Sequence, residues 1–171
     1  PLYPASRYSL SWFPGVTQAY TSVLSTHGSL RMASASRWLE AWAAGVAAVA
    51  AALGSGERCA LLMNGAALSE RGLELAGRIA QKTGAQLFAD TFVTRIARGA
   101  GRVDVQRVPY FGEQAAEVLA PYRHLILVAT KAPVTFFAYP GKPSELTPIG
   151  CVTHVLSTPE QDALAALDAL C

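Results

Sequence analysis

The sequence predicts an α/β fold in which a doubly wound parallel sheet lies between two layers of helices, and three observations predict it. Short apolar runs alternate along the chain with segments of helical periodicity. The apolar runs are continuous, as in strands that are covered on both faces. The connections are long enough to hold the crossovers that parallel neighbours need. A three-layer, Rossmann-like sheet is therefore the expected architecture.

The first elements follow from capping residues and turn glycines. Ser36 is predicted to cap a helix that ends at Gly54, and residues 59–64 (CALLMN) are predicted to form the first strand. Ser69 is predicted to cap a second helix, whose apolar residues fall largely on one face and which ends at Gly84.

The second half of the chain continues the alternation. The predicted strands are residues 85–90 (AQLFAD), 105–108, 123–130 (RHLILVAT) and 151–158 (CVTHVLST). The strand over residues 105–108 is the weakest of these, and a loop with a short helical turn precedes it. A helix over residues 112–119 is closed by Pro121. Thr158 is predicted to cap a last helix that has Pro159 at its first position.

Composition limits the class of protein. Residues 1–35, rich in Ser, Pro, Tyr and Thr, are interpreted as a poorly specified leader or a truncated upstream segment, and residues 36–171 as the domain. The apolar run over residues 41–53 is shorter than the roughly 20 residues of a membrane span. A formal net charge of +2 and scattered arginines argue against nucleic acid as a partner. Three distant cysteines indicate neither a disulfide framework nor a zinc site, and a reducing cytoplasm fits best.

Ligands of such sheets bind beside the carboxyl ends of the strands, where the strand order reverses. The candidate cofactor-binding residues in the loops at that edge are Asn64, Gly65, Asp90, Thr91, Thr130 and Lys131. A pyrophosphate prefers several glycines at a helix N-terminus, whereas this turn offers only Gly65, and Glu70 would repel an anion. Asp90 could hold ribose hydroxyls, or it could simply cap the loop after its strand.

The sequence shows no complete catalytic constellation. His124 and His154 lie in predicted strands without a nearby Ser or Cys and an Asp in triad order, so no catalytic residue is assigned. No residue cluster has the spacing of a metal site. Two lysines flank a loop that could cover a ligand or dock onto another domain, and its aromatic residues are Phe136, Phe137 and Tyr139.

Two long stretches carry a resemblance to a known family. Residues 60–92 (ALLMNGAALSERGLELAGRIAQKTGAQLFADTF) and 107–144, together with the terminal strand and helix, resemble the central domain of thiamine-diphosphate-dependent enzymes of the acetolactate synthase large subunit-like and benzoylformate decarboxylase-like group. The stretch KAPVTFFAYPGKPS, within residues 107–144, is the most specific part. The resemblance covers about four-fifths of the chain and implies a domain of the DHS-like NAD/FAD-binding type.

The resemblance also implies partners and cofactors. In the parent enzymes, which are lyases or transferases of 2-keto acids and usually homo-oligomers, one flanking domain binds the pyrimidine of thiamine diphosphate and supplies a catalytic glutamate. The other flanking domain binds the diphosphate through magnesium. The central domain holds FAD in acetolactate synthases, ADP or a CoA moiety in some relatives, and no nucleotide in benzoylformate decarboxylases.

Three departures from the flavin-binding pattern favour a scaffold without a nucleotide. The glycine-rich turn is reduced to Gly65, KAPVTFF replaces an Arg- and Asp-rich loop, and STPEQD replaces the acidic residue after the last strand. The chain also lacks the Gly-Asp-Gly start of a diphosphate motif. We therefore expect a fragment or isolated central domain that is inactive alone and holds no cofactor alone. The alternatives are a stand-alone FAD- or ADP-binding module, or a structural domain in which the aromatic loop is an interface.

Overall fold

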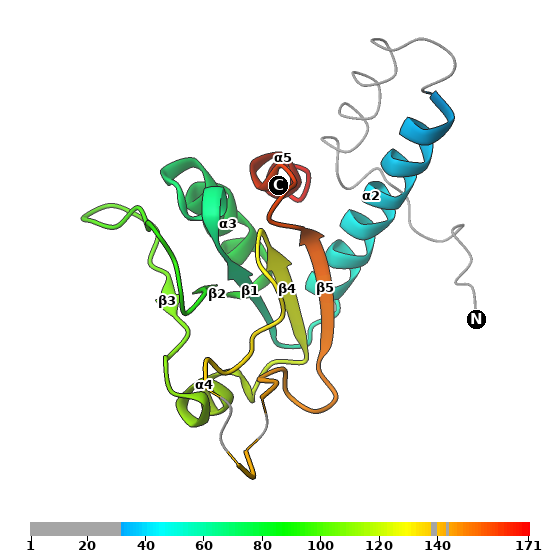
Figure 1. Cartoon of the computed structure of the whole chain (residues 1–171). Coiled ribbons are helices and arrows are strands. Elements are labelled where there is room, and N and C mark those ends of the chain that lie inside the picture. Colours follow the sequence, from blue (N-terminus) through cyan, green and yellow to red (C-terminus); the bar gives the residue numbers. More distant parts are fainter. Residues whose placement is uncertain (1–31, 138–139, 143) are drawn as a thin grey trace.

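The structure is a computed structural model that describes residues 32–137, 140–142 and 144–171 (Figure 1). Five parallel strands form one sheet in the order β3-β2-β1-β4-β5. The strands are β1 (Cys59–Met63), β2 (Gln86–Ala89), β3 (Gln106–Arg107), β4 (His124–Val128) and β5 (Val152–Ser157). The helices are α2 (Met32–Leu53), the 3-10 helix η2 (Gly65–Leu68), α3 (Glu70–Thr83), α4 (Gly112–Leu119) and α5 (Ala163–Asp168).

Alternating side chains of the central strands build two cores, one on each face of the sheet. Leu61 and Met63 of β1 pack with α2, α3 and α5, whereas Ala60 and Leu62 pack with α4. All five residues of β1 are buried, as expected for a parallel strand that is covered on both sides. The predicted three-layer α/β fold is therefore confirmed.

The strand order reverses between β1 and β4. The chain moves outward from β1 to β2 and β3, and then returns to the other side of β1 to form β4 and β5. Met63 pairs with Ala89 of β2 on one side and with Val128 of β4 on the other, so these three strands end level with one another. The loops that follow them therefore meet at a single point of the sheet edge.

The two ends of α3 follow the sequence prediction. Ser69 Oγ accepts a hydrogen bond from Gly72 N (3.2 Å), and Gly84 adopts the left-handed conformation (φ 74°) after the last turn. Gly72 is required for a second reason, because a Cβ there would lie 2.4 Å from the carbonyl oxygen of Ala67 in η2. The start of α3 is thus pressed against the turn that follows β1.

Helix α2 begins earlier than predicted. It starts at Met32, so Ser36 lies inside the helix and the prediction that it is the cap is wrong. Ala and Met are strong helix formers, which explains why the helix extends upstream of the serine. The predicted end is confirmed, since Gly54 N donates to Ala50 O (3.0 Å). Among the described residues, none of the helices combines the length and hydropathy that a membrane crossing requires.

The start of α5 also differs from the prediction. The helix begins at Ala163, and Asp162 caps it by accepting hydrogen bonds from Leu164 N and Ala165 N, both at 3.0 Å. Thr158 and the proline after it lie in the turn before the helix. An aspartate cap bonds two backbone N–H groups and adds a favourable interaction with the helix dipole, so it defines the start more strongly than the threonine.

The connection from β4 to β5 contains no helix among its described residues, as the sequence predicts. It folds back on itself through an isolated bridge between Val134 and Glu145, and Leu146 N donates to Pro133 O (3.0 Å). The side chain of Leu146 is buried in the core under α4. This packing anchors the base of the loop that carries Phe136 and Phe137.

Candidate functional site

A cleft of about 440 Å³ opens where the strand order reverses. It is lined by the turns after β1, β2 and β4 and by the turn that leads into α5. Five of the six predicted cofactor-binding residues line it: Asn64, Gly65, Asp90, Thr130 and Lys131. Thr91 is the exception, because its side chain lines a neighbouring hollow instead.

The polar side chains of the cleft bond to one another. Thr130 Oγ1 donates to Asp90 Oδ2 (2.7 Å), and Asn64 Nδ2 donates to the same oxygen (3.3 Å). The backbone N–H of Thr91 donates to Asp90 Oδ1 (2.6 Å). We call these four residues the Asp90 network. Since Asn64, Asp90 and Thr130 follow β1, β2 and β4, the network ties together the carboxyl ends of three strands.

The backbone at the mouth of the cleft is unusual at two positions. Gly65 has a φ of 55°, and a Cβ there would lie 4.0 Å from the Cβ of Ala129. Ala129 itself has a φ of 53°, a left-handed conformation that is costly for a residue with a side chain. Its N–H donates to the carbonyl and hydroxyl oxygens of buried Ser157, at 3.0 and 3.1 Å. Strain of this kind concentrates at binding sites.

The groups in the cleft offer little to a pyrophosphate. Gly65 N already donates to Asn64 Oδ1 (2.8 Å), so it is not available to an anion. Helix α3 does not follow β1 directly, because η2 lies between them. The first turn of α3 is capped by Ser69 and carries Glu70, whose negative charge disfavours an anion there. Both oxygens of Asp90 accept internal hydrogen bonds in place of ribose hydroxyls. These residues therefore fit a bound dinucleotide poorly.

The described residues also include no group of three or more His, Cys, Asp or Glu placed to hold a metal ion. In the enzymes that the sequence resembles, magnesium and thiamine diphosphate are expected on the flanking domains.

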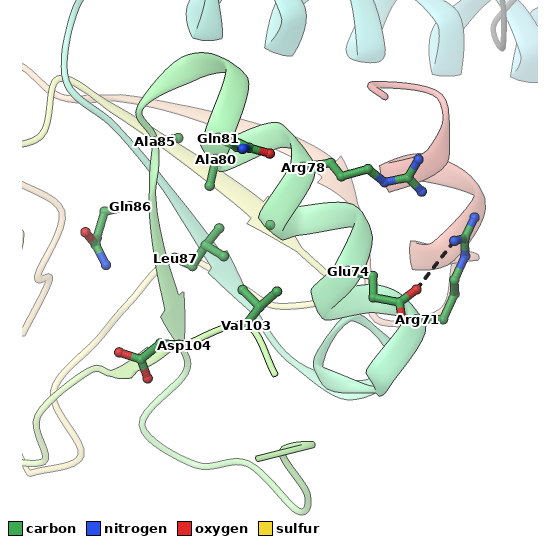
Figure 2. Close-up of a pocket in the computed structure, with 11 residues that line it drawn as sticks. Arg71, Glu74, Arg78, Ala80, Gln81, Ala85, Gln86, Leu87, Val103 and Asp104 are labelled. Atoms are coloured by element: carbon green, nitrogen blue, oxygen red, sulfur yellow. Dashed lines mark ion pairs between the residues drawn. The ribbon is translucent and has the colours of Figure 1, made fainter. Parts of the chain in front are cut away.

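A wider groove of about 760 Å³ runs along α3 and the start of β2 (Figure 2). Leu87 and Val103 form apolar parts of its lining. Arg71 on its rim lies 3.6 Å from a carboxylate oxygen of Glu74 and 3.3 Å from one of Asp168. These ion pairs are exposed to solvent, and the charge of Arg71 is balanced by the two carboxylates. None of the predicted cofactor-binding residues lines the groove. We therefore assign the candidate site to the cleft.

Sequence reasoning missed a contact between the two strand histidines. His124 Nδ1 lies 3.1 Å from His154 Nε2, and His124 Nε2 lies 2.8 Å from Glu57 Oε2. Burial lowers the pKa of His154, and the neighbouring His124 lowers it further. His124 begins β4, so this histidine pair lies toward the amino end of the sheet, away from the cleft. Only the pairing of β4 with β5 brings the two rings together.

A set of exposed aromatic rings lies beside the cleft. Phe136 is centred 5.1 Å from Phe92 and 6.0 Å from Tyr110, and Phe137 is 4.8 Å from Phe136. The aromatic cluster consists of Phe92, Tyr110, Phe111, Phe136 and Phe137, which are between 43% and 61% exposed. The sequence predicted only the part of it that lies in the loop after β4. Tyr139 of that prediction lies outside the described residues.

The fold and the position of the cleft define a Rossmann-like α/β domain. No family model and no solved structure matches the chain. It is 49% identical over 124 residues to a protein of Mycobacterium tuberculosis (strain ATCC 25618 / H37Rv) named "Putative acetolactate synthase large subunit IlvX". The match covers 71% of this chain and 24% of the relative, so the chain spans about a quarter of the relative's length. The chain is thus homologous to part of an acetolactate synthase large subunit-like protein.

Proposed function

We propose that residues 36–171 form the central domain of a thiamine-diphosphate-dependent enzyme of the acetolactate synthase-like group. The observation that carries this proposal is the 49% identity to a quarter of a relative with that name. A match of 124 residues is the size of one ordinary domain, so the relative has room for further domains of similar size. The proposed partners are the domains that bind the pyrimidine and the diphosphate of the cofactor, and the proposed assembly is a homo-oligomer.

On this proposal the domain is a scaffold and has no catalytic residue of its own. The thiamine diphosphate, held with magnesium by the flanking domains, would supply the nucleophilic carbon that attacks a 2-keto acid. The reaction of the whole enzyme would be decarboxylation or carboligation, in a cytoplasmic protein. The contribution of this chain would be a rigid sheet on which the flanking domains are held.

The Asp90 network supports a vestigial nucleotide cleft. Its side chains lie where a Rossmann-like sheet places the groups that bind a nucleotide, yet they bond to one another. The network thereby supplies from inside the chain the contacts that a ligand would otherwise make between β1, β2 and β4. Lys131 is exposed at the mouth of the cleft and would be the first contact of any remaining anionic ligand.

Calorimetric titration of the purified chain with FAD and then ADP tests this proposal, with circular dichroism to verify that the sample is folded. We expect no saturable heat from the folded chain. Binding at micromolar strength, about −8 kcal/mol, would instead favour a stand-alone nucleotide-binding module. In that case Lys131→Gln should weaken the binding, while the matched change Lys82→Gln, on a lysine outside the cleft, should not.

A second experiment tests the partner part of the proposal. The regions of the M. tuberculosis relative on either side of the matched segment are expressed and mixed with this chain, and the mixture is analysed by size-exclusion chromatography with light scattering. The matched segment of the relative serves as the positive control. Co-elution is expected. Failure of this chain to associate, where the relative's own segment does, would contradict the proposed scaffold role.

A further inference from the structure

A second hollow, of about 420 Å³, lies beside the carboxyl ends of β2 and β3. It is lined by Thr91, Phe92, Val93, Thr94, Arg107, Val108 and Tyr110, and we call it the β2–β3 hollow. Its volume falls near the lower end of the range for small-molecule sites, about 300–1,000 Å³. This size suits a single ring system rather than a dinucleotide.

Aromatic rings form one side of the hollow. Phe92 and Tyr110 meet edge to face with their centroids 5.9 Å apart, and Phe136 packs against both. These contacts fix the two rings in place, yet Phe92 is still 55% exposed and Tyr110 is 43% exposed. Val108, which is 1% exposed, adds an apolar residue to the lining. A flat aromatic molecule could therefore stack here without rearrangement of the wall.

The hollow also holds an uncompensated positive charge. Within the part of the chain that the structure describes, the Arg107 guanidinium has no hydrogen-bond or ion-pair partner, and no acidic residue lines the hollow. Arg71 and Arg102, by contrast, pair with carboxylates, and Arg98 donates to Val105 O. What distinguishes Arg107 from the remaining unpaired arginines is its place beside the exposed rings of Phe92 and Tyr110. A guanidinium binds a carboxylate or a phosphate through two parallel N–H donors.

We propose that the β2–β3 hollow binds a planar aromatic molecule that carries one anionic group. The ring lies against Phe92 and Tyr110, and the anion is held by Arg107, with Thr94 on the same lining. The polar groups of the adjacent Asp90 network are already hydrogen-bonded to one another, so a ligand would gain few new hydrogen bonds by extending into the cleft. This site is independent of the scaffold role proposed above.

The test is a two-dimensional ¹H–¹⁵N NMR titration of the whole chain with 2-naphthoate. We expect shifts confined to residues 91–94 and 107–110, with a dissociation constant between about 0.1 and 1 mM, as suits a fragment-sized ligand. The neutral isostere 2-naphthamide and the non-aromatic anion cyclohexanecarboxylate should both bind more weakly. Tighter binding of 2-naphthyl phosphate than of 2-naphthoate would support the site and assign the anion as a phosphate, and the reverse order would assign a carboxylate.

Variants separate the charge from the ring. Arg107→Gln should weaken 2-naphthoate by about tenfold or more, as expected for the loss of a hydrogen bond to a charged group, and should leave 2-naphthamide nearly unchanged. Phe92→Leu should weaken both. Arg95→Gln, on an exposed arginine outside the hollow, is the matched control and should change neither. The proposal is overturned by the absence of localised shifts up to about 5 mM, or by equal affinities of the wild type and Arg107→Gln for 2-naphthoate.

Discussion

Replacing Thr130 by Val tests whether the Asp90 network holds the strand ends together. The change keeps the branched shape of the side chain and removes only the hydroxyl that donates to Asp90 Oδ2 at 2.7 Å. Thr130 is 6% exposed, so water cannot readily replace the lost donor. A hydrogen bond to a charged group contributes about 1.5–3 kcal/mol. We therefore expect Thr130→Val to lower the free energy of unfolding by about 2 kcal/mol.

Urea unfolding followed by circular dichroism measures this loss. For an m-value of about 2 kcal/mol/M, the midpoint should fall by about 1 M while the m-value stays constant. The matched control is Thr91→Val, because the Thr91 hydroxyl makes only a long contact with Pro109 O (3.5 Å) and should cost no more than about 0.5 kcal/mol. Equal losses for the two variants would refute the reasoning. A double-mutant cycle with Asp90→Asn should show a coupling energy above about 0.5 kcal/mol.

Two further predictions concern the other end of the sheet and the start of α3. Because the pKa of folded His154 is lowered from 6.5, the unfolded chain binds more protons, and the stability that is complete above pH 6.5 is lost as the pH falls below it. His154→Gln should flatten this slope in urea titrations from about pH 5 to 7, and an unchanged slope would contradict the assignment. Gly72→Ala should lower the free energy of unfolding by about 1–3 kcal/mol or more, because its Cβ would meet Ala67 O at 2.4 Å. Gly84→Ala has no such clash and should cost only about 1–2 kcal/mol for its left-handed backbone. Gly72→Ala should therefore lower the melting temperature more than Gly84→Ala does, and a smaller loss for Gly72→Ala would argue against the close approach.

Much of the fold follows from local sequence signals. Ser69 and Gly84 bound α3 as predicted, because a side-chain cap and a left-handed glycine act within a few residues of the helix ends. The start of α5 was missed because Thr158 and Asp162 are both acceptable caps, and the aspartate bonds two N–H groups. Propensity could not distinguish them, since the choice depends on where the turn after β5 places the chain.

The candidate cleft could be predicted because parallel strands end at a common edge. From that rule alone, six residues were predicted to lie at one site, and five of them line the cleft in the structure. Thr91 lies just beyond the end of β2 and lines the neighbouring hollow instead of the cleft. The bonds of Asp90 with Asn64 and Thr130, and the ring contact of Phe92 with Phe136, could not be predicted, because they join side chains that are distant in the sequence.

The separation of the Asp90 network along the chain has a consequence for folding kinetics. Its side-chain bonds link residues that are 26 and 40 positions apart, so they can form only after the intervening connections have placed β1, β2 and β4 side by side. Contacts of such long range form late in folding, when the loops between the strands have already been closed. Loss of the network should therefore accelerate unfolding and leave the folding rate almost unchanged. The Asp90 network would then lengthen the lifetime of the native sheet by slowing its unfolding.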